Sequence, residues 1–261
     1  MNDAPEITVL DLFSGIGGFS LGLEAAGPFR TIGFCERDKF CQAVLKKHWP
    51  DVPIASDINS IDANRHRGVD LICGGPPCQP WSQSGKKLGT KDDRDLWPEM
   101  VAVIKDLRPQ WVIVENVSRF VDDRMGLQRC LADLDSIGMQ AATFVVPAFS
   151  VGAPHRRYRC FIVSHADLNG QQTERAAGGP IRQNKRHNPL RSGANTDRQR
   201  DVKSGLGRNL SNGVSGWMDE PDIPRVQPRV EFRVERLRAI GNAVIPQIVE
   251  QIGRAILKAE Q

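Results

Sequence analysis

Short apolar runs alternate with longer segments of helical spacing from residue 7 to about residue 165. Strands that alternate with helices form parallel β-α-β units, in which a strand buried on both faces reads as a continuous apolar run. The pattern therefore predicts an α/β fold with a doubly wound sheet. Strands are expected at 7–13, 31–36, 55–58, 69–75, 111–117, 142–148 and 159–165, and helices at 19–27, 38–49, 97–109 and 126–138.

The composition changes after the last of these strands. Residues 169–216 are rich in Asn, Gln, Ser, Gly and Arg and carry about three times as many basic as acidic side chains, so we expect loop or disorder in the free protein. Order returns at 233–259, where helical spacing predicts a last helix that packs back on the sheet. The residues with this spacing are Val244, Ile248, Ile252, Ala255 and Ile256. We expect three regions, 1–165, 166–232 and 233–261.

Charge and cysteine usage restrict the class of protein. The net charge of +4 permits an anionic partner without requiring one. The six cysteines have irregular spacings and no CxxC pair, which favours reduced thiols over a zinc site or a disulfide framework. The N-terminal segment has no signal-peptide pattern, and no stretch is long and apolar enough to cross a membrane. We therefore expect a soluble, cytoplasmic protein without a metal or a membrane partner.

A glycine-rich turn follows the first expected strand. In DLFSGIGGFSLGLE, Gly15, Gly17 and Gly18 open a helix, and such a turn allows close approach of an anionic ligand to the backbone. A tight strand-to-helix turn without a ligand explains the glycines about as well. Glu36 ends the second strand, where an acidic side chain accepts hydrogen bonds from both ribose hydroxyls. The pair points to an adenosine-containing cofactor, and Asp57 is either an acceptor for adenine or a helix cap.

Cys78 lies in GGPPCQPWSQSG, between prolines that keep the backbone extended or turned. Most free cysteines are small buried hydrophobic residues. This one follows the carboxyl end of an expected strand, which is where open α/β sheets bind ligands. Because a positioned thiolate is a strong nucleophile, Cys78 is the candidate for covalent catalysis.

Glu115 closes the apolar strand WVIVENV. Burial of a carboxylate is costly, so we expect this side chain to be paired with an arginine, protonated, or turned toward a cleft. In GAPHRRYRCFIV the alternation of a strand sends Arg157 and Arg159 to one side and Arg156 and Tyr158 to the other. Two guanidinium groups on one face bind a carbonyl or phosphate oxygen, or form a solvated basic edge.

Taken in this order, the segments resemble the C5-cytosine-specific DNA methyltransferase family, which makes 5-methylcytosine. DLFSGIGGF is similar to the family's first cofactor motif, GGPPCQPWSQSG to its catalytic loop and ENV to its carboxylate strand. HRRYR is similar to its paired-arginine motif, and RLRAIGNAVIPQIVEQI to its C-terminal cofactor motif. The likeness covers residues 7–165 and 233–256, and PCQ followed by ENV is highly specific. It implies a Rossmann-like methyltransferase sheet.

The resemblance implies a DNA (cytosine-5-)-methyltransferase that uses S-adenosyl-L-methionine. Cys78 would add to C6 of cytosine, Glu115 would bind N3 and the exocyclic amine, and Arg157 and Arg159 would stabilise O2. This chemistry needs no metal. The family's cofactor-binding positions fall here on Phe13, Ser14, Gly15, Gly17, Glu36, Asp57, Ile58, Leu96, Asn242 and Ala243.

Double-stranded DNA is the partner that the resemblance implies, with a monomer on DNA as the default expectation. The target carbon is inaccessible in a stacked duplex, so the base must be rotated out of the helix. The loop that follows Cys78 would close over the rotated base and contact phosphates, or would form a solvated polar loop. Its candidate DNA-binding residues are Gln79, Ser82, Ser84 and Lys86.

The interval between the paired arginines and the C-terminal motif, roughly 166–235, is shorter than the family's separate target-recognition domain. We interpret it as a reduced recognition region that contacts DNA mainly through phosphates and orders on binding. Such trimmed versions resemble solitary methyltransferases of phages and prophages. The analogy suggests protection from restriction in a bacterial or phage-infected cell.

Three other functions stay open on the sequence. An RNA cytosine methyltransferase would use the same catalytic residues. A DNA-binding module derived from a methyltransferase would suit the short recognition region but would not require Cys78 or Glu115. A nucleotide-dependent oxidoreductase explains the glycine turn and Glu36 but leaves PCQ and ENV unexplained.

Overall fold

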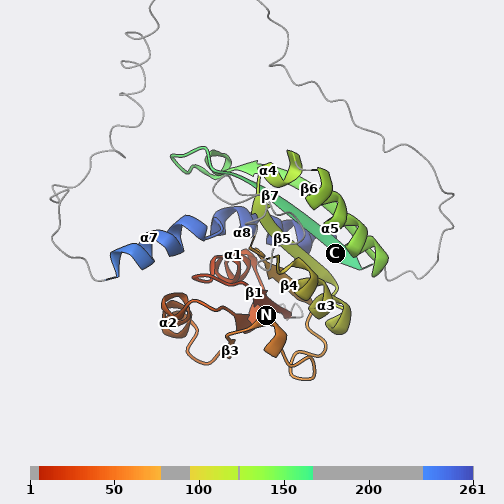
Figure 1. Cartoon of the computed structure of the whole chain (residues 1–261), viewed down its shortest axis with the longest axis horizontal. Coiled ribbons are helices and arrows are strands. Elements are labelled where there is room, and N and C mark those ends of the chain that lie inside the picture. Colours follow the sequence, from red (N-terminus) through yellow and green to blue (C-terminus); the bar gives the residue numbers. More distant parts are fainter. Residues whose placement is uncertain (1–5, 78–94, 123, 167–231, 261) are drawn as a thin grey trace, which may run out of the picture. The chain divides into compact units, whose positions relative to one another are not determined.

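Seven strands of the described residues form one mixed sheet (Figure 1). The structure is a computed structural model that describes residues 6–77, 95–122, 124–166 and 232–260, all within one compact unit. The strand order is β3-β2-β1-β4-β5-β7-β6. The strands are β1 Ile7–Leu12, β2 Phe29–Cys35, β3 Ile54–Ala55, β4 Leu71–Gly74, β5 Trp111–Val117, β6 Met139–Pro147 and β7 Tyr158–Ala166.

Helices cover both faces of the sheet. On one face, Met100 and Ile104 of α3 and Leu134 of α5 pack against sheet residues such as Ile72. On the other face, α1 and α8 pack against a layer that includes Ile113. The helices are α1 Gly18–Ala26, α2 Lys39–His48, α3 Trp97–Leu107, α4 Arg119–Asp122, α5 Arg124–Ser136, α7 Arg233–Asn242 and α8 Pro246–Ala259, with 3-10 turns η1 Ile58–Ser60 and η4 Ala148–Val151.

The doubly wound α/β fold predicted from the sequence is confirmed, with one difference in strand direction. β7 runs antiparallel to both of its neighbours, and Cys160 lies opposite Asn116 of β5 and Val145 of β6. The expectation of parallel strands is therefore wrong for β7. The physical reason is the connection 148–157, which holds only η4, whereas a parallel crossover needs a dozen or more residues.

The C-terminal segment forms two helices instead of one. Pro246 has no backbone N–H and suits the first position of a helix, so α8 begins there after a short break. Val244, which we expected within the helix, is buried in that break. Ala255 is exposed, whereas Val249 lies on the buried face. The expectation that the last helix packs on the sheet is confirmed, because Ile248 joins the same core as the central strands.

Helices α1 and α8 are in close contact at Gly22. A Cβ there would lie 2.4 Å from the main-chain oxygen of Pro246 and 2.7 Å from Cβ of Val249, so the atoms would overlap. Although alanine is the better helix former, we expect Gly22→Ala to lower the free energy of unfolding by about 1–3 kcal/mol. Urea unfolding measures the change, with Leu21→Ala on the exposed face of α1 as the matched control. Equal stability of the Gly22 variant and the wild type would contradict this packing.

No helix among the described residues is long and apolar enough to cross a membrane. Within the same part of the chain, no three His, Cys, Asp or Glu side chains form a group that would hold a metal ion.

Candidate functional site

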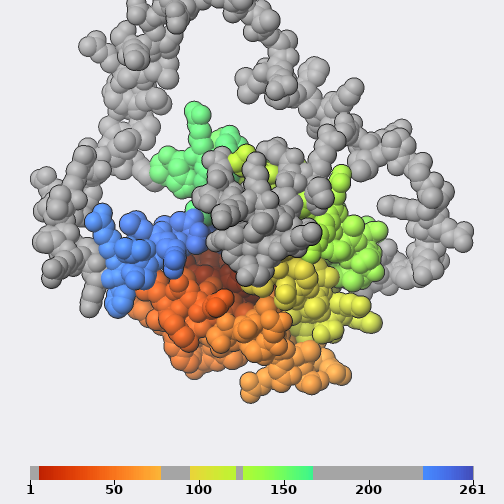
Figure 2. All heavy atoms as spheres, viewed as in Figure 1, coloured from red at the N-terminus to blue at the C-terminus, as the bar shows by residue number. Residues whose placement is uncertain are grey.

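A cleft lies at the carboxyl edge of the sheet, where β1 and β4 are neighbours. After β1 the chain adds β2 and β3 on one side, and after β4 it adds β5 on the other. This is the topological switch point at which open α/β sheets bind ligands. The cleft encloses about 1150 Å³, more than the usual pocket for one small ligand. α7, which adds to its walls, abuts the segment that contains α2 in the space-filling view (Figure 2).

The glycine turn and Glu36 meet at one side of this cleft. The Gly15 N–H donates to Glu36 Oε2 at 2.7 Å, and the Asp38 N–H donates to Oε1 at 2.6 Å. Gly15 has a φ of +54°, and the space where its side chain would project is open. Burial raises the pKa of Glu36, although the N–H groups of Asp38 and Gly15 oppose the shift. The two features that the sequence analysis paired therefore lie in direct contact.

Five other expected cofactor positions also line the cleft. Phe13 follows β1 with a left-handed backbone, Leu96 precedes the first residue of α3, and Asn242 ends α7. Asp57 accepts the N–H two residues further on and so caps η1, and its side chain faces solvent at the cleft wall. Ile58 follows it as a buried residue. The two interpretations of Asp57, cap and ligand acceptor, are compatible in this geometry.

Three expected cofactor positions are not on the cleft wall. Ser14 is buried, and its hydroxyl forms hydrogen bonds with main-chain groups of β1 and β2. Gly17 is required for packing, because a Cβ there would lie 2.6 Å from the ring of Trp49. The carbonyl of Ala243 accepts a hydrogen bond from an arginine side chain. These three residues therefore support the glycine turn and the break between α7 and α8 without lining the cleft.

Glu115 combines two of the three states expected for it. Its Oε1 pairs with Nε of Arg159 at 2.7 Å, and its side chain lines the cleft. Arg159 stands opposite Val117 on the antiparallel strand β7, one diagonal step from Glu115 on the same face. Burial raises the pKa of Glu115, and the positive charges of Arg159 and Arg157 oppose that shift. The cleft thus contains a carboxyl group that keeps its proton to a higher pH than usual.

Arg157 has different partners from Arg159. Its Nη1 donates to the carbonyl of Gly241 at 2.6 Å, and its Nη2 donates to the carbonyl of Ala243 at 2.8 Å. The flanking side chain of Arg156 is exposed, whereas Arg157 is half-buried. The structure therefore brings Arg159 to Glu115 and Arg157 to the C-terminal segment.

The proposed nucleophile and its loop lie outside the described residues, namely Cys78, Gln79, Ser82, Ser84 and Lys86. Pro76 and Pro77, which come directly before Cys78, line the cleft. The described part of the chain therefore ends at the cleft wall, directly before Cys78.

Several described cysteines are unsuited to act as nucleophiles. Burial raises the pKa of Cys35 and of Cys41 to about 12, and the pKa of Cys160 to about 11. Burial also raises the pKa of Cys73 well above its usual range. Because the thiolate is the reactive form, these four thiols are poor nucleophiles at neutral pH.

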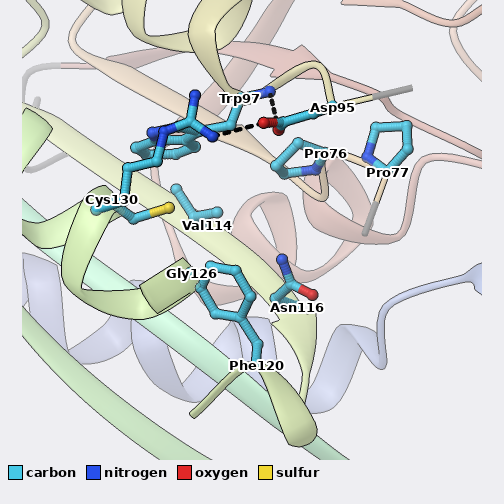
Figure 3. Close-up of a pocket in the computed structure, with 10 residues that line it drawn as sticks. Pro76, Pro77, Asp95, Trp97, Val114, Asn116, Phe120, Gly126 and Cys130 are labelled. Atoms are coloured by element: carbon cyan, nitrogen blue, oxygen red, sulfur yellow. Dashed lines mark hydrogen bonds and ion pairs between the residues drawn. The ribbon is translucent and has the colours of Figure 1, made fainter. Parts of the chain in front are cut away.

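A small cavity of about 20 Å³ also borders Pro76 and Pro77 (Figure 3). Asp95 lines it as well and is the first described residue after the 78–94 segment. The Asp95 carboxylate accepts hydrogen bonds from Nη1 of Arg129 at 2.5 Å and from the N–H of Trp97 at 3.3 Å. The residues on both sides of the 78–94 segment therefore border the same cavity.

Asp11 is a buried acidic residue that the sequence analysis missed. It lies on β1 with no exposed surface, its Oδ2 accepts a hydrogen bond from the Ser20 hydroxyl at 2.8 Å, and its Oδ1 has no hydrogen-bond partner. Burial raises its pKa to about 8. The signal was present in ITVLDLF, where an acid interrupts an apolar strand as Glu115 does. Asp11 links β1 to the start of α1, beneath the glycine turn.

Asp11 makes stability depend on pH in a defined direction. The folded chain keeps the Asp11 proton up to about pH 8, whereas the unfolded chain loses it near its ordinary pKa of 3.8. The folded state therefore binds more protons between these values, and stability falls as pH rises through that window. We expect the free energy of unfolding of Asp11→Asn, relative to that of the wild type, to increase from about pH 4 to about pH 8. Above about pH 8 this difference should stay constant. Thermal unfolding across this pH range measures the difference. A difference in melting temperature that does not change with pH would contradict the raised pKa of Asp11.

Helix α7 contributes wall residues that were not among the expected cofactor-binding positions. Glu235 and Arg238 line the cleft, and Nη1 of Arg238 lies 3.7 Å from Oδ2 of Asp38. At the start of α7, the ring of Phe232 contacts that of Phe40, with 6.0 Å between the centroids. These contacts join helices that are far apart in the sequence, so the spacing of residues along the chain could not reveal them.

Comparison with known proteins supports one family. The family model for C-5 cytosine-specific DNA methylase matches residues 7–215. The Type II methyltransferase M.AplI of Arthrospira platensis is 35% identical over 161 residues, which cover 61% of this chain and 46% of that protein. M.PspPI of a Psychrobacter species is 36% identical over 162 residues, which cover 60% of this chain and 39% of that protein. The match spans less than half the length of these relatives.

Solved structures share the fold. A DNMT2 variant from Spodoptera frugiperda superposes with a TM-score of 0.53 at 21% identity, covering 66% of this chain and 54% of that one. A prophage-encoded E. coli protein assigned to the DNA modification methyltransferases gives a TM-score of 0.52 at 26% identity, covering 62% of this chain and 47% of that one. Because the DNMT2 variant is only 21% identical, its likeness to this chain concerns the fold alone.

Proposed function

The chain belongs to the C-5 cytosine-specific DNA methylase family, and on this premise we propose that it transfers a methyl group from S-adenosyl-L-methionine to C5 of cytosine in double-stranded DNA. The observation that carries the proposal is the Glu115–Arg159 pair on the wall of the switch-point cleft. A buried carboxyl group with a raised pKa suits proton donation to a ring nitrogen.

One side of the cleft fits the cofactor. Glu36, at the end of β2, would accept hydrogen bonds from the ribose hydroxyls, and the open space beside Gly15 would admit a ligand close to the backbone. Phe13, Ile58 and Leu96 offer apolar surface on the same wall. When bound, S-adenosylmethionine supplies an electrophilic methyl group that C5 of cytosine accepts.

The protein's own residues would activate the base. C5 of cytosine is a poor nucleophile, so the Cys78 thiolate would first form a bond from Sγ to C6 while Glu115 donates or shares a proton at N3. C5 then becomes enamine-like. Arg159 would stabilise O2 and hold the Glu115 carboxyl in place. Once C5 carries the methyl group, loss of the C5 proton to a base breaks the Sγ–C6 bond and regenerates the thiolate. These steps require no metal ion.

Access to C5 requires rotation of the target base out of the duplex. We propose that the loop with Gln79, Ser82, Ser84 and Lys86 covers the rotated base and contacts phosphates. We also propose that the region 166–232 serves as a reduced recognition element, and that methylation protects DNA from restriction. The position of Pro76, Pro77 and Asp95 at one cavity supports this proposal, because the described residues before and after the 78–94 segment lie close together.

Methyl transfer from labelled S-adenosylmethionine tests the proposed function. Unmethylated duplex DNA and a tRNA pool are offered separately to the full chain, and cofactor binding is measured in parallel. We expect label in DNA, with bisulfite sequencing placing it at cytosine. Label in tRNA alone would instead identify an RNA cytosine methyltransferase. Cofactor binding without transfer to either substrate would identify a binding module.

A further inference from the structure

The guanidinium group of Arg157 spans two main-chain carbonyls of the C-terminal segment. The contacts to Gly241 and Ala243 measure 2.6 and 2.8 Å and join residues more than eighty positions apart in the chain. Hydrogen bonds from a charged donor are stronger than those between neutral groups. Arg157 therefore fixes the place at which α7 ends.

The two carbonyls lie where a helix leaves acceptors without intrahelical partners. The last carbonyls of an α-helix have no N–H ahead of them, and the negative end of the helix dipole favours a cation there. α7 ends at Asn242, and only the Ala239 carbonyl is bonded by the N–H of Ala243. Arg157 thus closes α7 and holds the start of the break before α8.

This break borders the cofactor side of the cleft. Asn242 lies between the two bonded carbonyls and lines the cleft, together with Arg238 from α7. Val244 packs against the first residue of α1, since a Cβ on Gly18 would lie 2.7 Å from its Cγ1 and 2.9 Å from its carbonyl oxygen. The segment that Arg157 holds is thus in contact with both the cleft and the glycine turn.

We propose that Arg157 is a positioning residue for the cofactor, not a contact to the target base. It holds residues 241–243 so that Asn242 and the wall of α7 are in place, while Arg159 serves Glu115 on the base side. This inference rests on the proposed function, because it presumes that S-adenosylmethionine binds in the cleft. It assigns Arg157 a different role from the one implied by the family resemblance.

Calorimetric titration of the full chain with S-adenosylmethionine, without DNA, tests the inference. We expect Arg157→Gln to raise the Kd roughly tenfold, which corresponds to the loss of about one charged hydrogen bond. Arg157→Lys keeps the charge and one donor, so it should recover part of the affinity. Arg156→Gln, on the exposed neighbour, is the matched control and should bind as the wild type does.

Steady-state kinetics separate this role from a contact to the base. Arg157→Gln should raise KM for S-adenosylmethionine more than it lowers kcat, whereas Arg159→Gln should lower kcat with little change in the cofactor Kd. If Arg157→Gln has a lower melting temperature than the wild type, the Kd and the kinetics of Arg157→Lys alone test the inference. Wild-type cofactor affinity in the Arg157 variants, or the same kcat loss as for Arg159→Gln, would overturn the inference. Failure of the wild-type chain itself to bind S-adenosylmethionine would overturn the proposed function, and this inference with it.

Discussion

We expect Cys78→Ser to lower the rate of methyl transfer roughly 10⁴-fold or more, while the Kd for S-adenosylmethionine stays close to the wild-type value. A serine hydroxyl is protonated at neutral pH and cannot add to C6 as a thiolate does. The loss should therefore appear in the chemical step and not in cofactor binding. Single-turnover transfer to duplex DNA, with calorimetric titration alongside, measures both quantities.

Cys160→Ala is the matched control for this prediction, because Cys160 does not line the cleft. Burial raises the pKa of the Cys160 thiol to about 11, so it supplies almost no thiolate at neutral pH and its loss should leave most of the activity. Substantial methyl transfer by Cys78→Ser would contradict covalent catalysis by Cys78. Complete loss in the Cys160 variant, at unchanged melting temperature, would contradict the assignment of the reactive thiol to Cys78.

We expect Glu115→Gln to lower kcat by about 10²–10⁴-fold, the range for removal of a general acid. Glutamine keeps the shape of the side chain, but it cannot donate an acid proton to N3, and its neutral amide cannot form the ion pair that the ionised carboxylate forms with Arg159. Because burial raises the pKa of Glu115, the wild-type kcat should fall as pH rises through that pKa. The variant should lack this decline. Rates measured across pH at saturating DNA and cofactor test both statements.

Glu250→Gln provides the comparison for Glu115→Gln. Glu250 pairs with Arg254 on the surface of α8 and does not line the cleft, so its variant should keep wild-type kcat and pH dependence. The melting temperature of the Glu115 variant must be measured too, because Arg159 loses its partner. A folded Glu115 variant with wild-type kcat at every pH would exclude Glu115 as the acid.

The central strands could be predicted well from the sequence. β5 spans Trp111–Val117, the same residues as the predicted strand, because a strand buried on both faces is a largely apolar run, here interrupted only by Glu115 and Asn116. The direction of β7 was not predicted, since apolar alternation is the same in parallel and antiparallel strands. The short connection that precedes β7 contained the missing signal.

The break between α7 and α8 was not predicted, for a different reason. Val244 and Ile248 keep helical spacing across it, and both are buried in the same core, so the apolar pattern continues where the backbone does not. Only Pro246 marks the start of a new helix. Patterns of burial therefore predicted which side chains face the core, but not where the main chain turns.

Residues of the candidate site could be predicted where an acidic side chain lies at the end of an apolar strand. Glu36 and Glu115 are acids at the ends of apolar strands, and parallel strands bring such ends to one edge of a sheet. Asp11 carries the same signal and was missed. Arg157 illustrates the remaining limit, because its carbonyl partners depend on how the end of α7 lies beside the residue that precedes β7, and no local pattern of residues encodes that contact.

The proposed covalent bond between Cys78 and C6 is tested most directly by trapping it. A duplex that carries 5-fluorocytosine at a methylated position should stop the reaction after methyl transfer, because fluorine cannot leave from C5 as the proton does. With S-adenosylmethionine present, we expect a complex that survives denaturation, with the base attached to the peptide that contains Cys78. Methyl transfer to normal DNA with no such complex, or attachment at another residue, would contradict the account.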